Sequence, residues 1–153
     1  HLTSYNLGWS IFLERGKPLF YFLFLWYNLF EEGIKMTKKE LYKVECEIEV
    51  AFTRLIGTLA IMQELELYKD IRGELSNLFK TIVSWGAKFQ IERNLNFITK
   101  EELINIHNRI DKIESHYVYL NYPGNETELS DEILIWFEEI FRLNNILTQA
   151  KCC

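Results

Sequence analysis

The sequence predicts an all-α protein of six helices that form one domain over residues 1–153. Apolar residues recur at spacings of three and four along most of the chain, which is the period of an amphipathic helix. Only two prolines and seven glycines occur, and most of them fall between the periodic stretches, where helices begin or end. No stretch alternates between apolar and polar residues for long enough to predict a strand.

The first two predicted helices cover about residues 3–15 and 18–32. Gly16 ends the first, and Pro18 stands in the first turn of the second, where its missing N–H costs nothing. Eleven of the twelve residues from 19 to 30 are apolar or aromatic. A membrane span needs about 20 such residues, so we expect no membrane span and a cytoplasmic protein.

A helix that is apolar on all sides should be covered on all sides. One side of the second helix can face the core of the domain. The opposite side then needs a partner, and we expect a homodimer. The predicted interface residues are Trp9, Phe22, Leu25, Trp26 and Leu29.

The third helix begins after Thr37, which forms a capping box with Glu40, and runs to about Glu66. A fourth helix covers about residues 68–94, with a kink near Gly73. The predicted buried stripe of the third helix is Leu41, Val44, Ile48, Ala51, Phe52, Leu55, Leu59 and Met62, and that of the fourth is Ile71, Leu75, Leu78, Phe79, Ile82, Trp85 and Phe89.

A second capping box, Thr99 with Glu102, opens the fifth helix. A loop is predicted over residues 121–130, and Ser130 is expected to cap the sixth helix. The tail at residues 149–153, with its two cysteines, is expected to be frayed.

Charge and motifs exclude several classes of function. The chain has 17 basic and 22 acidic residues, a net charge of −5, which argues against binding to nucleic acid. The sequence has no phosphate-binding glycine loop, nucleophile elbow or zinc motif, so we expect no enzyme, no metal and no cofactor. The glutamates at 40, 45, 47 and 49 are interpreted as solvated charges.

Three polar residues lie within apolar stretches. Arg54 and Lys88 each either extend to the surface or meet an anion, because an unpaired buried charge is costly. His107 shares or borders the buried stripe of the fifth helix, where it is a core histidine, a polar contact for a ligand, or a haem ligand. Gly57 and Gly86 fall within helices, which indicates close helix crossings or space left for a ligand.

The order of the helices resembles that of a known family. The segments are "FLERGKP", "LFYFLFLWYNLFEE", "TKKELYKVECEIEVAFTRLI" and "LFKTIVSWGAKFQIERN", followed by a last pair of helices. The chain resembles the haem-free, globin-related sensor domains of stressosome regulators and of a sporulation sensor histidine kinase. It is most similar to the free-standing sporulation-inhibitory versions of that kinase domain found in bacilli.

The resemblance implies a globin-like fold without haem, a homodimer, and an apolar tunnel that takes a fatty acid with a halide such as chloride nearby. It further implies a non-catalytic protein that inhibits sporulation by competing with a sensor histidine kinase for its signal. Arg54, Lys88 and His107 would then meet the carboxylate or halide. The tunnel would be lined by Phe52, Leu55, Leu59, Ile82, Trp85, Phe89, Ile106 and Ile110.

Two alternatives remain open at this point. One is a haem-based gas sensor on the same fold, with His107 as the axial ligand. The other is a helical interaction protein of the Bcl-2 kind. The stretch "VSWGAKF" resembles the Trp-Gly-Arg helix start of that family, but Lys88 stands one residue too late for the arginine.

Overall fold

The computed structural model describes residues 34–117 and 126–152, which form four α-helices, one short 3-10 helix and two three-residue strands. Most of this part of the chain is helical, as the periodicity predicts, and residues 93–99 form the turn between α4 and α5. The two helices predicted before residue 34 lie outside the described residues. The elements are β1 (Ile34–Met36), α3 (Lys38–Glu64), η1 (Glu66–Ile71), α4 (Arg72–Glu92), α5 (Lys100–Tyr117), α6 (Glu126–Gln149) and β2 (Ala150–Cys152).

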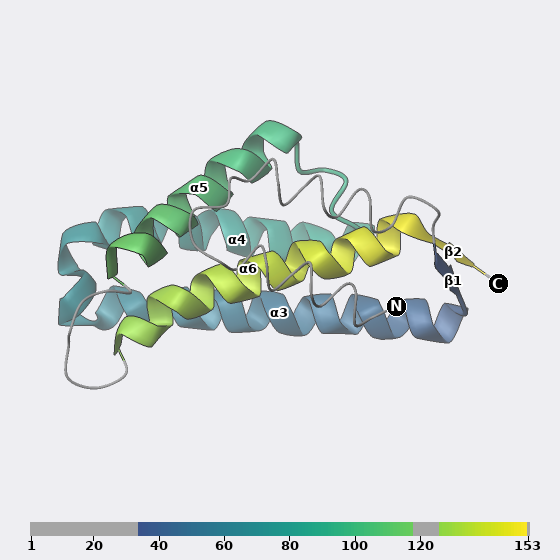
Figure 1. The fold of residues 1–153 in the computed structure, drawn as a ribbon, viewed down its shortest axis with the longest axis horizontal. Coiled ribbons are helices and arrows are strands. Elements are labelled where there is room, and N and C mark those ends of the chain that lie inside the picture. Colours follow the sequence, from purple (N-terminus) through teal and green to yellow (C-terminus); the bar gives the residue numbers. More distant parts are fainter. Residues whose placement is uncertain (1–33, 118–125, 153) are drawn as a thin grey trace.

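The three longest helices, α3, α4 and α6, run alongside one another, and α5 crosses them obliquely (Figure 1). α3 packs against both α4 and α6, whereas α5 packs mainly against α6. None of the helices in the described segments is long and apolar enough to cross a membrane.

Both predicted capping boxes are present. At the start of α3, the Thr37 backbone N–H donates to Glu40 Oε1 at 3.0 Å, and the Glu40 N–H donates to Thr37 Oγ1 at 3.1 Å. At the start of α5, the same two bonds join Thr99 and Glu102, at 3.3 and 3.1 Å. Each box satisfies two backbone donors that a helix start otherwise leaves without a partner.

Two helix boundaries differ from the prediction. The helix expected from residue 68 begins at Arg72, because residues 66–71 form the 3-10 helix η1, in which Tyr68 is fully buried and has non-helical backbone angles. α6 begins at Glu126, four residues before the predicted cap. Ser130 is therefore a fully buried residue within the helix, and Glu128 takes a first-turn position that favours acidic residues.

The two strands were not predicted. β1 precedes α3 and β2 follows α6, and the two pair in parallel, with Ile34 opposite Ala150 and Met36 opposite Cys152. The tail expected to be frayed is thus paired as far as residue 152. The start of α3 and the end of α6 lie at the same end of the molecule, so the flanking segments meet (Figure 1). A three-residue strand is too short to show a period of two in the sequence.

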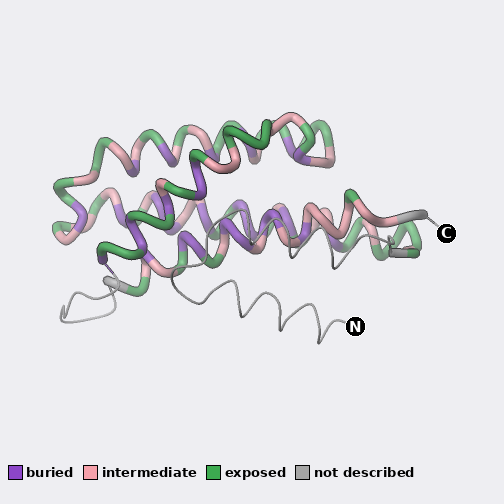
Figure 2. Tube along the Cα trace, turned by 45° about the horizontal axis from the view of Figure 1, so that its top comes forward, coloured by how far each residue is buried: buried purple, intermediate pink, exposed green. Residues whose placement is uncertain are grey.

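The core lies between the helices, on the stripes that the spacing predicts (Figure 2). Of the α3 and α4 stripes, only Leu41, Ile71 and Phe79 are half-buried instead of buried. α5 and α6 complete the core with Ile106, Ile110, Ile113, Tyr117, Ile133, Leu134, Phe137, Ile140, Phe141 and Leu143.

Candidate functional site

The three residues predicted to meet an anion have different surroundings. The exposed Arg54 guanidinium lies 5.0 Å from the centre of the Trp136 ring, and the exposed Lys88 ammonium lies 5.4 Å from that of Phe97. Both follow the surface alternative, in which a basic side chain covers an aromatic ring and keeps its charge in water.

His107 is in the core. It is 4% exposed, and its ring centre lies 5.7 Å from that of Phe137 on α6. Burial lowers the pKa of His107 to about 4, because the charged imidazolium loses its hydration there. The imidazole is neutral at pH 7. Its ring lies beside Phe137, whereas Arg54 and Lys88 lie over Trp136 and Phe97.

The eight residues predicted to line a tunnel are all buried and belong to one core cluster. Phe52 and Phe89 are 6.1 Å apart between ring centres, and both line a groove of about 230 Å³ between α3 and α4. This groove lies over Gly86, and a Cβ atom there would be 3.4 Å from Phe52 Cδ1. Because ligand sites commonly hold roughly 300–1,000 Å³, the groove is small for a lipid. A continuous tunnel through the core stays a prediction.

A larger cavity, of about 540 Å³, lies between the C-terminal half of α5 and the segment formed by η1 and the start of α4. We call it the α4–α5 pocket. One wall comes from η1 and the first turn of α4, and the other from the last three turns of α5. Its lining residues are Ile71, Glu74, Arg109, Lys112, Ile113, His116 and Tyr117.

The helical period of α5 places its pocket residues on one face. Arg109, Lys112, Ile113 and His116 stand at spacings of three, four and seven, so their side chains leave the helix on the same side. Ile113 is buried, whereas Lys112 and His116 are exposed. The pocket therefore combines an apolar floor with a basic rim, in a protein whose net charge is negative.

Tyr117, the last residue of α5, also lines this pocket. Its ring packs edge-on against Tyr68 of η1 at 4.8 Å and against His116 at 4.8 Å. Burial, with the nearby Asp70 carboxylate, raises the pKa of the Tyr117 phenol above its ordinary value, so the phenol is neutral at pH 7.

One of the three basic side chains is already paired. Arg109 Nε donates to Glu74 Oε1 at 2.6 Å, across the pocket from α5 to α4. Among the described residues, Lys112 and His116 form no ion pair. These two side chains can therefore bind an external anion without displacing an acidic residue.

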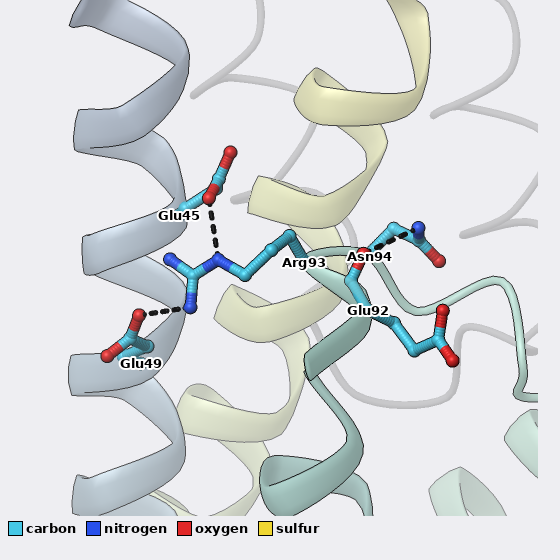
Figure 3. Close-up of polar contacts among 5 residues, drawn as sticks. All are labelled: Glu45, Glu49, Glu92, Arg93 and Asn94. Atoms are coloured by element: carbon cyan, nitrogen blue, oxygen red, sulfur yellow. Dashed lines mark hydrogen bonds and ion pairs between the residues drawn. The ribbon is translucent and has the colours of Figure 1, made fainter. Parts of the chain in front are cut away.

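A third cavity, of about 350 Å³, lies beside Arg93. Its arginine is held by two glutamates of α3: Arg93 Nε lies 2.7 Å from Glu45 Oε1, and Nη1 lies 2.6 Å from Glu49 Oε1 (Figure 3). Of the four glutamates predicted to be solvated charges, Glu40 and Glu47 are exposed. Glu45 and Glu49 are partly exposed, and both pair with Arg93. With its charge neutralised, Arg93 is a poorer anchor for an anion than the rim of the α4–α5 pocket.

Glu138 of α6 is a buried acid that was not predicted from the sequence. It is 0% exposed, and neither carboxyl oxygen has a hydrogen-bond partner among the described residues. Burial, and then the charges of Asp111, Glu114 and Asp131, raise its pKa to about 9, so the side chain is a neutral acid at pH 7. Its position, four residues after Leu134 and three before Phe141, could have indicated burial. Within the described segments, no group of three or more histidine, cysteine, aspartate or glutamate side chains could hold a metal ion.

The residues of the α4–α5 pocket were also missed. His116 was not among the predicted site residues, and Glu74, Arg109 and Lys112 were not considered. The signal was present in the sequence, since positions 109, 112 and 116 of an acidic protein are basic and share a helical face with an isoleucine. Comparison with protein-family models, with curated proteins and with solved structures finds no match to this chain.

Proposed function

We propose that this protein is a non-catalytic binding protein for a long-chain carboxylate, and that the α4–α5 pocket holds this ligand. The observation that carries the proposal is the position of Lys112 and His116 at the rim of an apolar floor made by Ile71 and Ile113. An aliphatic chain would lie on the floor, and its carboxylate would meet the basic rim.

The energetics suit such a ligand. Each methylene group removed from water contributes about 0.8 kcal/mol, so a chain of roughly ten groups gains enough to offset the loss of its freedom on binding. The Lys112 ammonium would orient the carboxylate of the ligand, since a carboxylate accepts strong hydrogen bonds from a cation. A volume of about 540 Å³ lies within the common range of ligand sites.

The biological part of the proposal rests on the resemblance in helix order and patterning. In this proposal the protein is a cytoplasmic, haem-free globin-like sensor that pairs as a homodimer through its N-terminal helices. By binding the fatty acid, with a halide such as chloride at the same basic rim, it withholds a signal from a sensor histidine kinase and so inhibits sporulation.

The first test is direct binding. The purified protein is extracted with organic solvent and analysed by mass spectrometry, and the delipidated protein is titrated with decanoate, palmitate and stearate by calorimetry. We expect one of these carboxylates to co-purify or to bind saturably. Absence of both a co-purifying lipid and any uptake would refute the proposed function.

A second test locates the site. The double substitution Lys112→Ala with His116→Ala should lower the affinity for decanoate about tenfold, the effect of losing one to two charge-assisted contacts. Lys88→Ala is the matched control, because Lys88 is an exposed cation outside this pocket that was predicted from the sequence to contact the head group. If Lys88→Ala weakens binding and the double variant does not, the ligand binds elsewhere, as the core-tunnel prediction requires.

A further inference from the structure

The two walls of the α4–α5 pocket are joined by a single described ion pair. Glu74 stands in the first turn of α4, Arg109 stands in the middle of α5, and the contact between them measures 2.6 Å. The two side chains are 36% and 30% exposed, so water and solutes reach the pair. Because α5 packs mainly on α6, this ion pair links α5 to a helix against which it packs little.

The chemistry of the pair makes it exchangeable. A guanidinium presents five N–H donors, and a carboxylate is the partner that fits it best. Besides Glu74, the described partner of Arg109 is Asn105 Oδ1, at the long distance of 3.5 Å. A ligand carboxylate arriving beside Lys112, one helical turn away on the same face, offers Arg109 the same group that Glu74 offers.

We infer that Glu74 is an internal competitor of the ligand: a bound carboxylate takes Arg109 from Glu74 and so opens the bridge between α4 and α5. This inference rests on the proposed function, because it needs a carboxylate in the pocket. Partly exposed ion pairs contribute about 0–1 kcal/mol, so the exchange requires little energy. The affinity observed for the ligand is reduced by the fraction of molecules in which Glu74 holds Arg109.

The exchange supplies a means of signalling. A ligand changes a conformation only to the extent that it binds one state better than another. Here the carboxylate favours the state with the open bridge, in which α5 has lost a link to α4. The bound protein should therefore hold the C-terminal half of α5 less firmly than the free protein.

The test uses the whole chain and two probes of similar length, decanoate and the uncharged decanol. Glu74→Gln should raise the affinity for decanoate roughly twofold to fivefold and leave that for decanol unchanged. Glu66→Gln is the matched control. Glu66 lies in η1 and pairs with Lys69 at 3.1 Å, is 72% exposed, and is not among the lining residues of the pocket. The Glu66→Gln substitution should change neither the affinity for decanoate nor that for decanol.

Hydrogen exchange provides a readout that needs no variant. In the wild-type protein, decanoate should speed amide exchange in residues 105–117 relative to the same protein with decanol. In an Arg109→Gln background, the added Glu74→Gln substitution should no longer change the affinity for decanoate. The guanidinium for which Glu74 and the ligand compete is then absent.

The outcomes separate the two proposals. If the wild-type protein binds no carboxylate, the proposed function fails. If it binds decanoate, but Glu74→Gln matches the wild type or raises the affinities for both probes equally, the competition is overturned while the proposed function stands. Slower exchange in α5 with decanoate would likewise overturn the opening of the bridge.

Discussion

Arg93 Nε lies 2.7 Å from Glu45 Oε1 and so joins the end of α4 to the first half of α3 (Figure 3). The same guanidinium binds Glu49 and lies 5.2 Å from the ring centre of Phe89. Arg93 adopts a left-handed backbone conformation, with φ at 59°, where it ends α4. The residue thus has two roles, one in its side chain and one in its backbone.

Substitution of Arg93 should separate these roles. Arg93→Ala removes both ion pairs and the cover over Phe89, and should lower the free energy of unfolding by about 1–2 kcal/mol. Arg93→Gly removes the same contacts but adopts a positive φ without strain, so it should be less destabilising than Arg93→Ala by about 1 kcal/mol. Urea denaturation measures both values, and equal losses would show that the left-handed conformation costs nothing here.

Glu138 should make the protein less stable as the pH rises. Below pH 4.5 its carboxyl is protonated in both the folded and the unfolded chain, so it causes no difference. Between pH 4.5 and about 9 the unfolded chain ionises while the folded chain does not, and the free energy of unfolding falls. Glu138→Gln removes this titration and should stabilise the protein at pH 8 by on the order of 2 kcal/mol.

Chemical denaturation at pH 5 and pH 8 checks this prediction. Glu139→Gln is the control, because Glu139 is the next residue on α6 and is only half-buried, paired with Arg142. If the Glu138→Gln variant loses as much stability between pH 5 and pH 8 as the wild type does, the Glu138 carboxyl is already ionised in the folded wild-type protein.

His107 should have the opposite effect on the acid side. Its imidazole is neutral in both states above pH 6.5, and between pH 6.5 and about 4 only the unfolded chain takes up the proton. The free energy of unfolding therefore falls as the pH falls through this window. Between pH 4.5 and 6.5 the contributions of His107 and Glu138 oppose each other, so the wild-type stability should change little there.

Single variants separate the two opposing contributions to the pH dependence of the free energy of unfolding. His107→Gln should leave a fall in stability with rising pH from about 4.5 onward, and Glu138→Gln should leave a rise up to about pH 6.5. In the double variant, these two groups should no longer contribute to the pH dependence of the free energy of unfolding. Identical pH profiles for the wild type and His107→Gln would mean that the folded protein protonates this imidazole normally.

The sequence predicted the elements that follow from local rules. The stripes on α3 and α4 and both capping boxes depend on spacings within one helix, and they were confirmed. Pairing between distant segments was not predicted, as with β1 and β2, which meet only because α3 and α6 bring their ends together. The left-handed Arg93 was not predicted either, because glycine or asparagine usually takes this conformation at the end of a helix.

The candidate site likewise combines features that follow from spacing within one helix with features that depend on contacts between distant segments. The basic face of α5 follows from its spacing, but the pocket exists because this face stands opposite Ile71 and Glu74, which belong to other elements. The predicted head-group residues Arg54 and Lys88 could not be placed by pattern alone. Each lies within an apolar stretch, and its side chain lies over an aromatic ring from another segment, which the sequence pattern does not reveal.

Gly57 and Gly86 lie within helices, and replacing each with alanine tests whether the space around it limits the residue to glycine. A Cβ at Gly57 would meet no atom of the described residues within 4 Å, whereas one at Gly86 would lie 3.4 Å from Phe52 Cδ1 and 3.8 Å from Ile56 Cδ1. Alanine is favoured over glycine within a helix by about 1 kcal/mol. Gly57→Ala should therefore raise the free energy of unfolding by about that amount. Gly86→Ala should gain less, because Phe52 must yield slightly, and it should partly fill the groove between α3 and α4. Thermal and urea unfolding of both variants measure the difference, and a destabilised Gly57→Ala would show that another part of the chain approaches α3 at that position.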